Sequence, residues 1–125
     1  MTALGTTTWV FSAGNVPPQS TGAEPEFTSR DELCLLNTGD ADTHVELWVY
    51  FEDRDPSGPF PITVGARRVC HRRINDLIDP HAIPLGVPYG LVVQSDAPIV
   101  AQLTRLDTRK AELATSTTLG FAGST

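Results

Sequence analysis

Hydrophobic and polar residues alternate most clearly over residues 44–52, which read "HVELWVYFE". The hydrophobic positions, at every second residue, are Val45, Leu47, Val49 and Phe51. Successive side chains of a strand point to opposite faces, so this pattern predicts a strand with one face in a hydrophobic core. The other face carries Trp48 and Tyr50 among charged residues, which is typical of a subunit interface or a ligand groove.

Further strand-like runs are separated by residues that favour turns, mainly Gly, Pro, Asn and Asp. These runs cover residues 6–12, 32–37, 62–74, 89–95, 98–106 and 113–121. We expect the run from residue 62 to break near Gly65. We also expect a Pro/Gly loop over 53–61, and a hairpin in which the runs on either side of 95–98 pair across a turn.

Helix is expected to be minimal. Three prolines between residues 75 and 88 exclude a long helix there and leave room for one helical turn, capped by Asn75 or Asp76. A chain of 125 residues with many short strands predicts one domain, residues 1–125. The fold we predict is an all-β, antiparallel β-sandwich of jelly-roll type with about eight strands.

The stretch 66–74 departs from simple alternation, because neither of its two faces is hydrophobic. Its four arginines are Arg67, Arg68, Arg72 and Arg73. The whole chain has a formal net charge of −6, and these cations stand in its less acidic half. They either pair with acids of the first half, within or between subunits, or line an anion or sugar site. A strand that is polar on both faces favours an oligomer, in which one face meets a neighbouring subunit and the other a ligand.

The cellular setting is predicted from what the sequence lacks. There is no charged start followed by an apolar segment, as in a secretory signal, and no apolar run of about 20 residues. We therefore expect a cytoplasmic protein that does not insert into a membrane. The two cysteines, Cys34 and Cys70, are expected to be reduced thiols in that compartment.

Motifs of catalysis and metal binding are missing as well. The sequence has no nucleophile elbow, no phosphate-binding loop and no zinc-protease motif. Its three histidines, His44, His71 and His81, do not have the spacing of metal ligands. We expect no enzymatic activity, no cofactor and no metal site.

Several motifs, taken in order along the chain, resemble those of the Anabaena sensory rhodopsin transducer family. They are "GAEPEF" (22–27), "LLNTGDADTHVE" (35–46), "ARR" (66–68), "INDLIDP" (74–80) and "TRLDTR" (104–109). The last two are the most specific, since two such strings in the right order are not expected by chance. The resemblance covers almost the whole chain.

The resemblance implies a cytoplasmic β-sandwich that assembles as a homotetramer and has no catalytic activity. It implies relay of a signal from a membrane photoreceptor, and binding of sugars or related metabolites. DNA binding has also been suggested for the family. Family members often carry Asn where this chain has Asp96. A carboxylate only accepts hydrogen bonds whereas an amide also donates, which points to a different ligand or affinity here.

Candidate ligand contacts are polar residues of the cationic strand and of the turn that follows it, two further polar residues at 96 and 105, and an aromatic platform. We expect them to be His71, Arg73, Asn75, Asp76, Asp96 and Arg105, with Trp9 or Trp48 as the stacking ring. Structural roles compete with each of these assignments. They are ion pairing for the arginines, including a bridge between Arg105 and Asp107, capping for the residues at 75–76, and core packing for a tryptophan.

Three functions follow in order of preference. The first is a non-enzymatic signalling module that senses a small polar ligand, a sugar or a related metabolite, and relays its presence through an oligomeric surface. The second is a soluble transducer that docks on a sensory rhodopsin. The third is a DNA-binding regulator. The four arginines of the stretch 66–74, with Arg105, Arg109 and Lys110 added, form a cationic patch that favours DNA binding, whereas the negative net charge of the chain disfavours it.

Overall fold

The computed structural model describes residues 2–20, 28–78, 82–109 and 114–123, and these form an almost purely β structure. Its strands are β1 (Thr6–Gly14), β2 (Arg30–Asn37), β3 (Thr43–Phe51), β4 (Ser57–Val64), β5 (Arg68–Arg73), β6 (Tyr89–Asp107), β7 (Ala114–Leu119) and β8 (Phe121–Ala122). The only helix of the described residues is the 3-10 turn η1 (Ile74–Asp76). No helix in this part of the chain is long and apolar enough to cross a membrane. The predicted all-β fold with about eight strands and minimal helix is confirmed.

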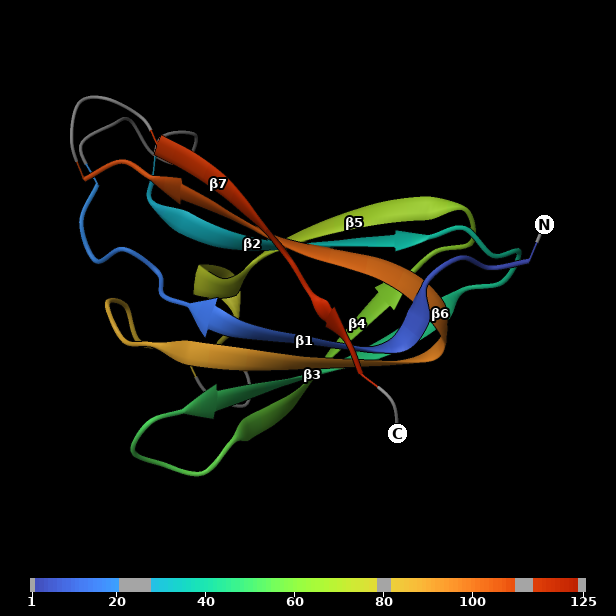
Figure 1. Ribbon diagram of the computed structural model, residues 1–125, viewed down its shortest axis with the longest axis horizontal. Coiled ribbons are helices and arrows are strands. Elements are labelled where there is room, and N and C mark those ends of the chain that lie inside the picture. Colours follow the sequence, from blue (N-terminus) through green and yellow to red (C-terminus); the bar gives the residue numbers. More distant parts are fainter. Residues whose placement is uncertain (1, 21–27, 79–81, 110–113, 124–125) are drawn as a thin grey trace.

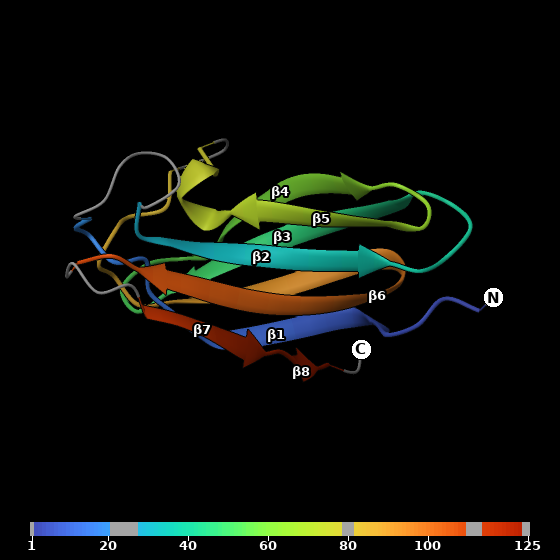
Figure 2. The ribbon, with the colours of Figure 1, turned by 90° about the horizontal axis from the view of Figure 1, so that it is seen from above.

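The strands form two layers that share one strand (Figure 1). One layer has the order β4-β3-β6-β1-β8, and the other consists of β5, β2, the second half of β6, and β7. All the pairings are antiparallel. Figure 2, seen from above, shows β2 and β5 in front of β3.

Strand β6 differs most from the sequence-based expectation, because it is one strand of 19 residues rather than a hairpin. Its pairing with β3 ends at Ser95, and its pairing with β2 begins at Val100. The turn-like segment 95–98 is therefore the place where the strand leaves one layer and enters the other. Pro98 lies between these two ladders, where its missing N–H removes no bond to β2 or β3.

The core lies between the layers and takes side chains from both. The buried residues of β2 and the second half of β6 are Leu33, Leu35, Ile99, Ala101 and Leu103. They pack with Val45, Leu47, Val49, Leu91 and Val93 of the facing layer. The predicted core face of β3 is thus confirmed, except that Phe51 is only half-buried at the end of the strand.

Strand β4 corrects the expected loop over 53–61, because residues 57–61 belong to the strand. Pro59 and Pro61 are exposed, and within the described part of the chain β4 pairs only with β3. An edge strand accepts proline because an N–H directed away from the sheet has no partner to lose. The buried Phe60 and Ile62 alternate with these prolines and fix the strand on the core.

The cationic strand β5 is also an edge strand, and among the strands described it pairs with β2 alone. None of its residues is fully buried, although Cys70 packs partly against the core. The position of β5 at the edge of the sheet therefore explains, within a single chain, why neither of its faces is hydrophobic. Charged side chains on an edge strand also discourage unwanted pairing with another sheet.

Candidate functional site

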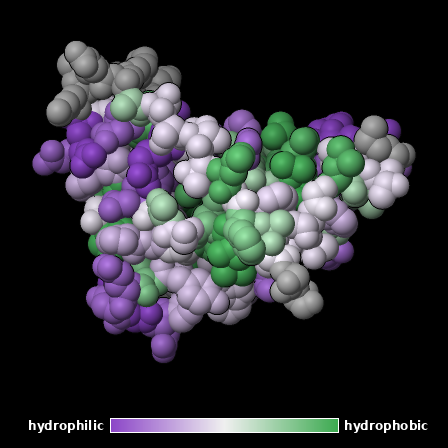
Figure 3. All heavy atoms as spheres, viewed as in Figure 1, coloured by the Kyte–Doolittle hydropathy of each residue, from purple (hydrophilic) through white to green (hydrophobic). Residues whose placement is uncertain are grey.

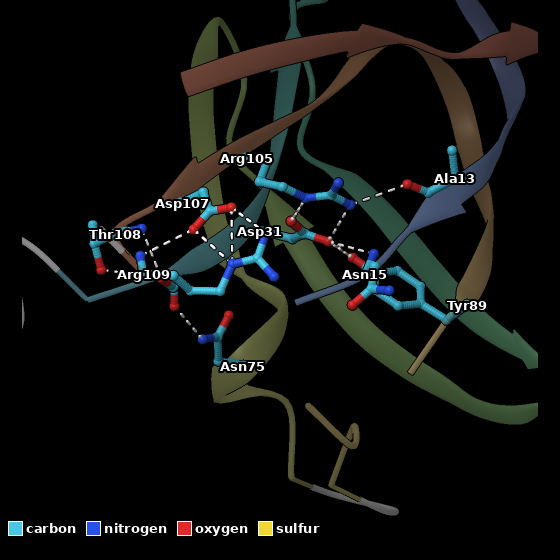
Figure 4. Close-up of polar contacts among 10 residues, drawn as sticks. Ala13, Asn15, Asp31, Asn75, Tyr89, Arg105, Asp107, Thr108 and Arg109 are labelled. Carbon is cyan, nitrogen blue, oxygen red and sulfur yellow. Dashed lines mark hydrogen bonds and ion pairs between the residues drawn. The ribbon is translucent and has the colours of Figure 1, made fainter. Parts of the chain in front are cut away.

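A buried carboxylate, Asp31, lies at the end of the sandwich where β6 both begins and ends (Figure 4). Its side chain is 0% exposed. Tyr89 donates its hydroxyl to Asp31 Oδ2 at 2.6 Å, and the backbone N–H of Asn15 donates to the same oxygen at 3.0 Å. Arg105 Nε donates to Oδ1 at 2.8 Å, and Arg105 Nη2 donates to the Ala13 carbonyl oxygen at 3.1 Å.

This network fixes the protonation of Tyr89 and Arg105. Burial raises the pKa of the Tyr89 phenol far above its ordinary value, and the charge of Asp31 adds to the shift. The hydrogen bond with Asp31 raises the pKa of Arg105, so its guanidinium stays charged. The phenol is therefore a neutral donor and the guanidinium a charged one, which together satisfy the buried carboxylate.

Arg105 therefore pairs with the buried Asp31 and not with the partner expected from the sequence. The predicted bridge between Arg105 and Asp107 is wrong, because Asp107 pairs with Arg109, with Arg109 Nη2 2.6 Å from Asp107 Oδ2. The hydrogen bonds from Arg109 lower the pKa of Asp107. Two cations of the patch considered for DNA are thus ion-paired, while Lys110 lies outside the described residues.

A cleft on the outer side of β5 brings three of the predicted ligand residues together. His71, Arg73 and Asp76 line it, and the volume of the cleft is about 300 Å³. The other lining residues are Glu32, Arg72 and Leu77. Strand β5 supplies the cations, η1 supplies Asp76, and β2 supplies Glu32, whose backbone pairs with Arg73. The cleft therefore offers hydrogen-bond donors and acceptors to one small polar molecule.

Asn75 lies next to this cleft and has a structural contact. Its amide donates to the backbone oxygen of Ser29 at 3.0 Å, which ties η1 to the segment before β2. The expected N-cap role is wrong for both candidates, because the N-cap of η1 is Arg73, without a side-chain cap. The predicted helical turn itself is confirmed.

The remaining candidates lie away from the cleft. Asp96 is in the bend of β6 and accepts a hydrogen bond from the backbone N–H of His44 at 2.9 Å. Trp9 packs against the core, and its indole N–H donates to the Ile99 carbonyl oxygen at 2.7 Å. Trp48 is on the outer face of β3, in the other layer. Neither of the two predicted tryptophans therefore supplies an aromatic platform at the cleft that holds His71.

Sequence reasoning missed Asp31, Tyr89 and Glu32. Asp31 and Glu32 stand side by side at the start of β2, one fully buried and the other half-buried. Neither local composition nor spacing separates their roles. The only available signal was strand alternation, which assigns the positions of Asp31 and Leu33 to one face.

The family comparison agrees with the resemblance in the sequence. The family model described as "Anabaena sensory rhodopsin transducer" matches residues 4–122. The chain belongs to this family. Among the curated proteins, none matches the chain.

Two solved structures resemble the chain closely. The Anabaena sensory rhodopsin transducer is 45% identical with a TM-score of 0.75, and the match covers 82% of this chain and 99% of that one. The Thermotoga maritima 1070 protein is 31% identical with a TM-score of 0.84, covering 96% of this chain and 98% of that one. The family relationship thus extends over nearly the whole fold.

We predict that the buried Tyr89 phenol makes stability fall at alkaline pH. Its pKa is raised on folding, so the unfolded chain releases this proton above about pH 10 while the folded chain retains it. The stability conferred by the neutral phenol is complete below that pH. Above it, the free energy of unfolding should fall by about 1.4 kcal/mol per pH unit relative to Tyr89→Phe.

Urea unfolding of the wild type and Tyr89→Phe between about pH 9 and about pH 11 measures this difference. The chain has two tyrosines, so a Tyr50→Phe background makes tyrosinate absorbance report Tyr89 alone. In that background the signal should appear only when the protein unfolds. A folded protein that shows tyrosinate absorbance at about pH 10 would contradict the raised pKa of Tyr89.

Proposed function

We propose that the chain is a non-enzymatic, cytoplasmic signalling module that senses a small polar ligand, a sugar or a related metabolite. The observation that carries this proposal is the cleft between β2, β5 and η1, where His71, Arg73 and Asp76 lie together. The family relationship supports a signalling role. The other predicted contacts, Asn75, Asp96, Arg105 and the two tryptophans, are not needed for this cleft.

The composition of the cleft favours a ligand with hydroxyl and acidic groups. Arg72 and Arg73 are permanent cations whose planar donors suit carboxylate or phosphate oxygens. Glu32 and Asp76 supply acceptors for hydroxyl groups. A sugar acid or a sugar phosphate therefore fits better than a neutral apolar molecule.

A second candidate function is docking on a membrane photoreceptor. The observation in its favour is the 45% identity to the Anabaena sensory rhodopsin transducer. Here the partner would be a sensory rhodopsin, and the signal would pass by protein contact. The two functions are compatible, because a ligand-sensing module also requires a surface that contacts its partner.

Self-association, as a homotetramer, is part of the proposal. Hydrophobic side chains are exposed on the layer that contains β5, β2 and β7. They include Leu36, Val69 and Leu119, which are 40%, 60% and 74% exposed. Figure 3 shows such side chains in two groups, one over the end of β7 and the other over the end of β2 and the start of β5. An apolar surface of this kind is typical of a subunit interface.

We predict that Arg73→Ala reduces ligand affinity by about tenfold or more, because a charge-assisted hydrogen bond is lost. The measurement is thermal melting with a panel of neutral sugars, sugar acids and sugar phosphates, followed by calorimetric titration of any hit. Arg68→Ala is the matched control, since Arg68 lies on β5 outside the cleft and bonds the Ala66 and Arg67 carbonyl oxygens.

The ligand assignment holds if Arg68→Ala binds as the wild type does and Arg73→Ala does not. Equal affinity in all three proteins would remove the cleft as the site. A panel without any hit would transfer the assignment to the photoreceptor-docking function. The search would then move to protein partners.

For the oligomer, we predict that Val69→Glu lowers the mass in solution, because it places a charge opposite Leu36 on the exposed apolar surface. Light scattering after size-exclusion chromatography measures that mass. Thr63→Glu, at an exposed position of β4 in the other layer, is the control and should leave the mass unchanged. A monomeric wild type would contradict the oligomer.

A further inference from the structure

The outer face of β2 and β5 places three metal-ligating side chains together. Glu32 and Cys34 are two residues apart on β2, and His71 is directly opposite Cys34 on β5. Their ligand atoms all lie within 4.8 Å of one another. This cluster is not visible in the sequence, because strand pairing brings together residues that are far apart in the chain.

The distances suit a small tetrahedral ion. His71 Nδ1 is 3.3 Å from Glu32 Oε1. Two ligand atoms that each lie about 2.0–2.1 Å from a tetrahedral zinc ion are about 3.3–3.4 Å apart. The Cys34 sulfur lies within 4.8 Å of these two atoms, whereas the third corner of the tetrahedron requires about 3.5 Å. The sulfur therefore has to approach them by up to about 1.3 Å, which side-chain rotation permits.

Glu32 is already oriented for such a role. Arg30 Nε is 3.2 Å from Glu32 Oε2, so one carboxylate oxygen is fixed while the other faces His71. Metal-binding carboxylates and imidazoles are commonly held by such second contacts. The side chains of Arg30 and Glu32 are only 21% and 22% exposed, which limits their freedom.

We propose that Glu32, Cys34 and His71 bind a divalent transition-metal ion of the zinc class. Three protein ligands leave a fourth position for water or another small ligand, as in open zinc sites. A thiolate together with an imidazole selects such ions over magnesium and calcium, which require oxygen ligands. Coordination of a thiol displaces its proton into solvent.

The position of this site relates it to the cleft. Glu32 and His71 line the cleft as well, so a bound ion would stand at its wall. The metal proposal does not rest on the ligand proposal, because its three ligands come from the geometry of β2 and β5 alone. The positive charges of Arg30 and Arg73 oppose a cation, so we expect weaker binding than at a closed structural zinc site.

The test is titration of the reduced, metal-free full chain with Co²⁺, followed by displacement with Zn²⁺. Cobalt bound to a thiolate gives a charge-transfer band that reports coordination by cysteine. The wild type should bind one equivalent with this band, and Zn²⁺ should abolish it. Cys34→Ser should lose the band and at least tenfold in affinity, and His71→Ala should lose a similar factor in affinity.

Cys70→Ser is the matched control, because Cys70 precedes His71 on β5 but is directed toward the core. It should keep both the band and the affinity. Melting without metal checks that each variant folds, and His71→Ala, at a side chain 53% exposed, tests the site if Cys34→Ser does not fold. A wild type without the band at millimolar Co²⁺, or a band that disappears in Cys70→Ser and remains in Cys34→Ser, would overturn the proposal.

Discussion

The fully buried carboxylate of Asp31 is the constraint on which the arrangement of the sandwich depends. An unpaired buried charge would be costly, so Asp31 requires its partners in place. They come from Asn15 after β1, from Tyr89 at the start of β6 and from Arg105 near its end. Because the two halves of β6 lie in different layers, one carboxylate ties both layers together at this end (Figure 4).

The inward position of Asp31 also determines what β2 presents to solvent. Side chains alternate along the strand, so Glu32 and Cys34 face outward while Leu33 faces the core. A shift of one residue would exchange the two faces and place Asp31 in water. The same register sets His71 of β5 opposite Cys34. The candidate cleft and the proposed metal site thus both depend on the interaction that closes the core.

Features that depend on the local alternation of residues could be predicted from the sequence. Features that depend on contacts between distant strands could not. The core face around Leu47 and the short turn at 74–76 were predictable because both are encoded within a few residues. The continuous strand β6 could not be predicted in this way, because the turn-forming residues at 95–98 favour a hairpin. The segment is a single strand because its two halves pair with strands of different layers. The partner of Arg105 could not be predicted either, because Asp31 lies 74 residues earlier in the chain.

The most direct test of this account is the free energy of unfolding of Asp31→Asn, measured by urea denaturation at neutral pH. Removing the charge leaves Arg105 and Tyr89 with a poorer partner, so the account predicts a loss of about 3 kcal/mol. Asp107→Asn, which affects an ion pair with the more exposed Arg109, should change stability little by comparison. An Asp31→Asn variant as stable as the wild type would contradict the central role of this carboxylate.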